Sequence, residues 1–183
     1  MTDPPNIAQE EAPPPVARGL QSVARGLRRL PARMLGAAIL KSSVVREVSD
    51  AKSATGQAAM VVVLVSGIAT VRDYGLGWFP MMITGAVHLL QWPVWAGIAY
   101  LVGGGKQEDR IRLLRVLGFA RTPAVLVALL PLIGGIQFAA HTWVLVAGVY
   151  GIRCTLEIGI IRAIAAAVLG MVPYWIVTAV YLL

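Results

Sequence analysis

Six charged side chains stand beside or within apolar sequence in the second half of the chain. The stretch LLRVLGFARTP, residues 113–123, contains two of them, Arg115 and Arg121, on either side of an apolar run. A guanidinium group binds phosphate and carboxylate through a planar fork of N–H donors. The sequence therefore predicts contacts with anionic lipid headgroups or with a protein partner. The candidate residues are Arg112, Arg115, Arg121, Arg153, Glu157 and Arg162.

Arg121 has two interpretations, because a charge inside a bilayer is costly unless it is paired or reaches the surface. It lies six residues beyond Arg115, roughly 9 Å along a helix, and its aliphatic stem can extend back to the headgroups. Alternatively, it pairs with Glu157, the nearest acidic candidate. Arg153 and Glu157 are four residues apart and share a helix face, so they can also pair with each other. The sequence leaves both interpretations open.

A second polar set, His88 and Gln91, lies one helical turn apart inside a long apolar segment. Such a pair can line a polar cavity or hold a quinone or a haem. It can also simply form hydrogen bonds between membrane helices, which is the simpler interpretation. His88 and Gln91 are therefore the candidate polar site within the membrane.

The chain lacks the residue patterns of common catalytic and metal sites. It contains no GxxxxGK[ST], HExxH, CxxC or GxSxG pattern. Its two histidines, His88 and His141, are too few for a usual zinc site. The apolar segments contain no pair of carboxylates for acid–base catalysis. We therefore expect a protein that is not an enzyme and that needs no cofactor and no metal.

The segments that must position these side chains are poor in charge. Of the 183 residues, 57% are hydrophobic and 14% are charged, whereas soluble domains average roughly 25% charged residues. Four stretches contain no Asp, Glu, Lys or Arg, namely residues 54–71, 75–102, 122–152 and 163–183. Each is close to or longer than the roughly 20 residues that a membrane-spanning helix needs. This pattern predicts an all-α membrane protein with several spans.

The distribution of basic residues predicts the topology. Residues 113–152 can form one long helix or a hairpin that turns at 131–137. With the hairpin, five transmembrane helices and a cytoplasmic amino terminus, every Lys and Arg except Arg72 lies on the cytoplasmic side, as the positive-inside rule favours. The predicted spans are 54–72, 78–102, 113–133, 137–153 and 160–183. Pro123, Pro131 and Pro173 could mark the discontinuous helices of a transporter, but no inverted repeat is visible, so we interpret them as packing kinks within these spans.

The net charge of +7 follows from the same basic flanks, which contact lipid phosphate. No nucleic-acid-binding motif accompanies the charge, so we expect no nucleic-acid partner. In the last predicted span, small residues at helical spacing favour close contact with another helix, within this chain or in a second copy. These residues are Ala163, Ala166, Ala167 and Gly170.

The chain divides into three parts. Residues 1–15 are rich in proline and acidic side chains, and we predict a disordered leader there. Residues 16–52 are basic and contain VARGL twice, with apolar and arginine positions at helical spacing, so we expect an amphipathic helix on the membrane surface. Within this part, residues 34–52 are either a surface or a re-entrant element. Residues 53–183 are the predicted five-helix membrane domain.

Several segments resemble one family of membrane proteins. They are SVVREVSDAKSATGQA at 43–58, RIRLLRVLGFARTPAVLVALLPLIGG from residue 110, WVLVAGVYGIR from 143, and the Ala-rich IRAIAAAVLGMVPYWIV from 161. The matching positions are Gly118, Phe119, Ala120, Pro123, Trp143, Gly151 and Arg153. Together, over about residues 40–180, these segments resemble the Yip (Rab/Ypt-interacting protein) domain family. The resemblance implies five membrane helices with a cytoplasmic amino terminus. It also implies a link to Rab-type GTPases and vesicle traffic, as in the eukaryotic members.

These observations predict a non-enzymatic integral membrane protein of Yip type that acts as a membrane scaffold or as an interaction or trafficking factor. We expect it in the inner (cytoplasmic) membrane of a bacterium. The expected partners are anionic headgroups at the inner face, together with a membrane-protein partner or a second copy of the chain. The alternatives are a small transporter or channel that uses the His88–Gln91 region, and an accessory subunit of a larger membrane complex.

Overall fold

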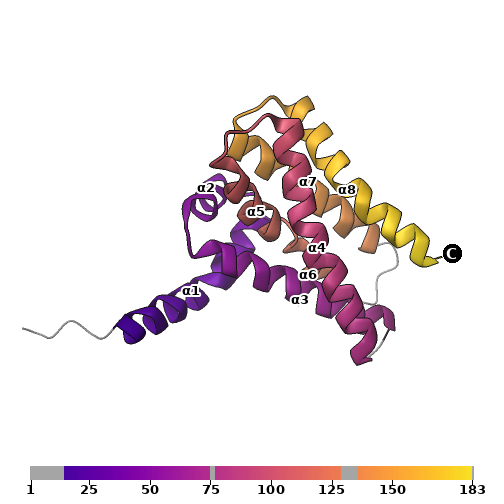
Figure 1. Ribbon diagram of the computed structural model, residues 1–183, viewed down its shortest axis with the longest axis horizontal. Coiled ribbons are helices and arrows are strands. Elements are labelled where there is room, and N and C mark those ends of the chain that lie inside the picture. Colours follow the sequence, from indigo (N-terminus) through magenta and orange to yellow (C-terminus); the bar gives the residue numbers. More distant parts are fainter. Residues whose placement is uncertain (1–14, 75–76, 129–135, 183) are drawn as a thin grey trace, which may run out of the picture.

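A computed structural model describes residues 15–74, 77–128 and 136–182, and these residues form eight helices without any strand (Figure 1). The predicted all-helical class is therefore confirmed. The leader predicted at residues 1–15 lies almost entirely outside the described residues. The helices are α1 (Pro15–Ala38), α2 (Ser42–Asp50), α3 (Ala54–Tyr74), α4 (Trp78–Gly103), α5 (Asp109–Phe119), α6 (Pro123–Ala128), α7 (Ile136–Leu156) and α8 (Ile160–Leu182).

Three helices in the described part of the chain are long and apolar enough to cross a membrane. The qualifying stretches are Ala54–Val71 in α3, Met81–Gly103 in α4 and Ile160–Val177 in α8, which correspond to the first, second and fifth predicted spans. Fewer than half of the residues in each stretch are buried within the protein. Their outward faces are apolar instead, as a lipid-facing surface requires. Large exposed side chains there include Val63, Leu64, Leu90, Leu101, Ile161, Ile164 and Leu169.

The segment predicted as one span at 113–133 is not one continuous helix. α5 ends at Phe119, and α6 begins at Pro123. A proline has no N–H and disfavours helical geometry in the residue before it, so a helix readily begins at this residue and seldom continues through it. The Thr122 hydroxyl donates to the Phe119 carbonyl at 2.7 Å, which satisfies one acceptor left open at the end of α5. Pro123 therefore starts a new helix instead of kinking an old one.

α7 runs antiparallel to α5. Gly151 of α7 faces Val116 of α5, and Gly148 faces Leu117, so positions rise along one helix as they fall along the other. α6 also packs against α7. The chain therefore reverses between α6 and α7, as the charge distribution predicted. Most of the predicted turn at 131–137 lies outside the described residues.

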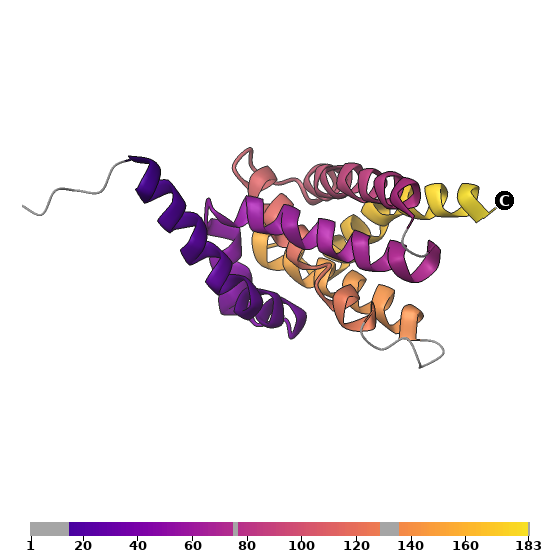
Figure 2. The same cartoon turned by 90° about the horizontal axis from the view of Figure 1, so that it is seen from below.

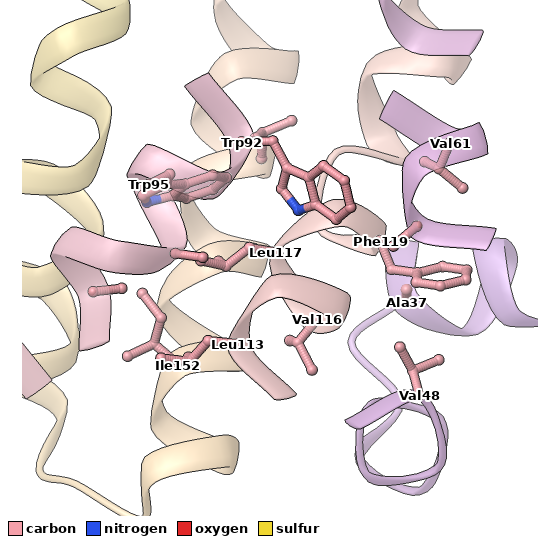
Figure 3. Close-up of a cluster of buried hydrophobic side chains, with 14 of the residues drawn as sticks. Ala37, Val48, Val61, Trp92, Trp95, Leu113, Val116, Leu117, Phe119 and Ile152 are labelled. Carbon is pink, nitrogen blue, oxygen red and sulfur yellow. The ribbon is translucent and has the colours of Figure 1, made fainter. Parts of the chain in front are cut away.

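The core is centred on Trp95 of α4, which is fully buried in the cluster drawn in Figure 3. Its indole Nε1 donates to the Ala167 carbonyl of α8 at 3.2 Å. Two glycines leave room for the ring: a Cβ on Gly148 would lie 2.6 Å from it, and a Cβ on Gly170 would also overlap it. The small residues predicted in the last span, including the fully buried Ala163, Ala166 and Ala167, thus allow α8 to pack closely on α4 within this chain.

A buried arginine of α1 is one of the links between the amino-terminal helices and the bundle. Figure 2 shows α1 extending from one end of the bundle, while α2 packs against α5 and α7. Arg33 of α1 is 6% exposed. Its guanidinium binds Glu47 of α2 at 2.8 Å and donates to Oε1 of Gln57 in α3 at 2.6 Å. The residues predicted as a surface or re-entrant element thus include α2, a short helix docked on the end of the bundle.

Gly118→Ala should destabilise the protein, because the added Cβ would lie 2.6 Å from the Cβ of Ala58 and 3.2 Å from its backbone. Overpacking of this kind costs about 1–3 kcal/mol. Thermal unfolding in detergent measures the effect. The matched control is Gly97→Ala on α4, where an added Cβ meets no atom within 4 Å. Equal midpoints for the two variants would contradict the close α3–α5 crossing.

Arg33→Ala should loosen α1, because charged hydrogen bonds of this kind contribute about 1.5–3 kcal/mol each. Hydrogen exchange in residues 26–38 should accelerate by about tenfold or more while exchange in α4 is unchanged. Arg29→Ala provides the control, since Arg29 is exposed on the same helix. The proposed role of Arg33 is refuted if both variants exchange at the wild-type rate.

Candidate functional site

Arg121 lies in the turn between α5 and α6, and its side chain enters the bundle. It is 6% exposed, whereas an arginine that anchors the protein to headgroups would be largely exposed. The turn is held by a hydrogen bond from the Ala124 N–H to the Arg121 carbonyl at 3.0 Å and by one from the Thr122 N–H to the Phe119 carbonyl at 2.9 Å. The break in the helix therefore fixes the direction of this side chain.

The partners of the Arg121 guanidinium are uncharged. Its Nη2 donates to Oε1 of Gln91 on α4, and its Cζ lies 6.0 Å from the centre of the Trp95 ring, a distance at which a cation is attracted to an indole face. Its Nε is buried and has no hydrogen-bond partner among the described residues. Arg121 is thus a buried cation with one neutral acceptor and one unused donor.

His88 lies close to this arrangement and is fixed by α3. The Ser66 hydroxyl is 2.8 Å from His88 Nδ1 and donates to the Val62 carbonyl at 2.7 Å. The His88 ring also lies 5.6 Å from the Tyr174 ring of α8, which in turn stacks on His141 of α7 at 6.3 Å. A row of three polar rings therefore runs from the buried His88 of α4, through the partly buried Tyr174 of α8, to His141 of α7, which is exposed.

A cavity of about 50 Å³ lies between these groups. Its walls come from α3, α4, α6, α7, α8 and the turn before α6, so most of the bundle converges on it. The lining residues are Val65, His88, Gln91, Arg121, Ala124, His141, Val144, Met171 and Tyr174. The sequence treated Arg121 separately from the His88–Gln91 pair, and the structure brings the three together.

The predicted alternative of an Arg121–Glu157 ion pair is not formed. Arg121 donates to Gln91 in the interior, whereas Glu157 is exposed and lines a different cavity at the end of the bundle. Glu157 has a positive φ of 54°, so the helix ends beside it, and the i, i+4 argument for pairing with Arg153 fails because it assumed a continuous helix.

The cavity at the end of the bundle, called here the basic cleft, has a volume of about 510 Å³. It lies where α2, α5 and α7 meet, and it gathers three of the predicted candidates, Arg112, Arg153 and Glu157. Arg112 pairs with Asp50 at 3.2 Å. The described residues that line it are Ser42, Val45, Arg46, Ser49, Asp50, Arg112, Tyr150, Arg153, Cys154, Thr155 and Glu157.

The sequence analysis did not select Arg46 or Asp50, which also line the basic cleft. They are four residues apart on α2, so their shared helix face was visible in the sequence. What was not visible is the docking of α2 on α5 and α7, which turns this face toward Arg112 and Arg153.

The other two candidate arginines form bonds within the protein. Arg115 donates to the Thr55 hydroxyl at 2.9 Å and to the Ser49 carbonyl at 2.7 Å. These bonds join α5 to the start of α3 and to the end of α2. Arg162 donates to the Val102 carbonyl at 2.9 Å, where a cation complements the carboxyl end of α4. Neither residue lines the basic cleft or the interior cavity.

Within the described ranges, no group of three or more His, Cys, Asp or Glu side chains is placed to hold a metal ion. No family model, curated protein or solved structure matches the chain. The resemblance to the Yip family therefore remains a prediction from the sequence.

Gln91→Leu should destabilise the protein by about 1–3 kcal/mol, because it leaves the buried Arg121 guanidinium without its acceptor. Adding Arg121→Met should restore most of the loss, since an apolar pair of similar size removes the unpaired charge. Thermal unfolding of the two single variants and the double variant in detergent gives the coupling. Strictly additive effects would show that the two side chains do not interact.

Proposed function

We propose that the protein is a non-enzymatic membrane scaffold of Yip type that binds anionic lipid headgroups at the inner face of the membrane through its basic cleft. The observation that supports this most directly is the convergence of Arg46, Arg112 and Arg153 on one cavity. One wall of the cleft is α7, which also exposes the apolar side chains of Trp143 and Val146, so a headgroup in the cleft would keep its acyl chains beside this helix.

The chemistry of the basic cleft fits a phosphate group. Within the described part of the chain, Arg112 is paired with acidic neighbours, while Arg46 and Arg153 form no ion pair. Hydroxyl groups of Ser42, Ser49 and Thr155 supply further donors around the cleft. The Thr155 hydroxyl oxygen is buried beside the cleft and has no partner among the described residues, so a rotation of this side chain toward the cleft would give it a phosphate oxygen as partner.

We propose five spans, with α5–α6 and α7 crossing the membrane in addition to α3, α4 and α8. The antiparallel packing of α5 and α7 supports this, because the two helices would then cross the membrane in opposite directions. The loops after α4 and before α8 lie at the same end of the bundle (Figure 1). This end includes most of the basic residues outside α1, and the positive-inside rule assigns it to the cytoplasm.

The double variant Arg46→Gln/Arg153→Gln should lose at least tenfold in bound anionic lipid, because each charged hydrogen bond contributes about 1.5–3 kcal/mol. The measurement is native mass spectrometry of protein taken from nanodiscs that contain phosphatidylglycerol and phosphatidylcholine in equal amounts. Arg110→Gln is the control, since Arg110 is exposed on α5 and does not line the cleft.

Retention of phosphatidylglycerol at the wild-type level by the double variant would overturn the proposed function. A protein that copurifies stoichiometrically with the wild type but not with the double variant would instead assign the cleft to an acidic protein partner. Retention must also fall with added salt, because attraction between exposed charges is screened.

A further inference from the structure

We propose that Arg121, Gln91, His88 and Tyr174 form an interior binding site for the carboxylate group of a monoanion. The site is separate from the basic cleft, since no residue in the described part of the chain lines both. It is a second site within the protein, and the proposed headgroup binding neither requires it nor predicts it.

The position of Arg121 makes an uncompensated charge costly. Its partner Gln91 is ten residues from Met81 and twelve from Gly103 in the apolar stretch of α4, roughly 15 and 18 Å from the two ends at 1.5 Å per residue. The guanidinium therefore lies near the middle of the stretch that crosses the membrane. Among the residues that the structure describes, no Asp or Glu lines the cavity beside it, so a bound anion would supply a countercharge.

The geometry of the cavity limits the ligand. A volume of about 50 Å³ holds about three or four water-sized groups, which fits formate or the carboxylate end of a longer molecule. The Nε of Arg121 is covered by protein and has no hydrogen-bond partner among the described residues, so a rotation of the guanidinium toward the cavity would present this prong of its fork to a carboxylate. One negative charge neutralises one arginine, whereas sulfate or a phosphate dianion would leave net negative charge in the core.

The walls favour an anion that has shed its water. Val65, Val144 and Met171 are apolar, and the buried Trp95 lies over the guanidinium. In a site of low polarity, a hydrogen bond between opposite charges is stronger than it is in water. The ring of Tyr174 lies between His88 and His141, so its position can respond to occupancy of the cavity that all three line.

An apolar groove of about 210 Å³ meets this site from the outside. It runs between α4 and α8 and shares Gln91 and Tyr174 with the interior cavity; its other lining residues are Val87, Leu90, Val94, Pro173 and Val177. Leu90 is 69% exposed, so the groove opens on the lipid-facing surface. The carboxylate can therefore belong to a free anion or to a single-chain fatty acid whose tail lies in the groove.

The test uses the full chain in detergent, with sodium formate replacing sodium gluconate at constant ionic strength. Gluconate is too large for the cavity. The thermal midpoint of the wild type should rise by several degrees and saturate, and Arg121→Met should abolish the rise. Arg110→Gln, which removes an exposed charge outside the site, should respond as the wild type does.

Sodium hexanoate distinguishes the two sources. If the chain of a fatty acid occupies the groove, hexanoate should half-saturate at a concentration at least tenfold lower than formate. If the two half-saturate alike, the ligand is a free anion. Either result supports the site, provided that the rise in thermal midpoint is absent from Arg121→Met.

Ala124→Leu keeps the guanidinium and fills the cavity that Ala124 lines. This variant tests the site if Arg121→Met does not fold. It should unfold at a similar temperature in gluconate and show no formate effect. The site is ruled out if formate and hexanoate give no saturable rise in the wild type, or if the rise persists in Ala124→Leu. A loss of lipid retention at the basic cleft has no bearing on this outcome.

Discussion

The burial of one guanidinium among apolar helices is the constraint on which the interior of this protein depends. Arg121 is a cation with an uncharged partner, and a charge in such surroundings must find acceptors or raise the free energy of the fold. The amide of Gln91 and the face of Trp95 meet part of that need. His88 of α4, His141 of α7 and Tyr174 of α8 place further polar side chains around the same point, so packing of apolar side chains alone does not explain this region of the core.

The broken helix explains how an arginine reaches that position. In a continuous helix from residue 113 to 133, the direction of the Arg121 side chain would be fixed by its position in the helical repeat. Because α5 ends before Arg121, the turn that precedes Pro123 determines this direction instead. Irregular backbone is tolerated at membrane depth where it is buried in protein or lines a cavity. Both conditions are met here, because Arg121 and Thr122 are buried and Arg121 lines the interior cavity.

Much of the fold follows from local sequence. Uncharged blocks identify α3, α4 and α8 without any tertiary information, and the asymmetry of basic residues predicts the reversal before α7. Pro123 was visible too, but a sequence does not say whether a proline kinks a helix or starts one. The meeting of Arg121 with Gln91, thirty positions away, and the docking of α2 beside Arg112 depend on how helices pack, so neither site could be assembled from spacing alone.

The seating of Trp95 between Gly148 and Gly170 has a consequence for the history of this sequence. A side chain cannot be added at either glycine while the indole remains, and a smaller residue at position 95 would remove the wall over Arg121. The three positions therefore cannot drift separately: related chains should either keep all three or replace them as a set. If residues 95, 148 and 170 covary with residue 121 in related chains, the chains that keep all four residues are those in which the buried arginine still packs beside the indole.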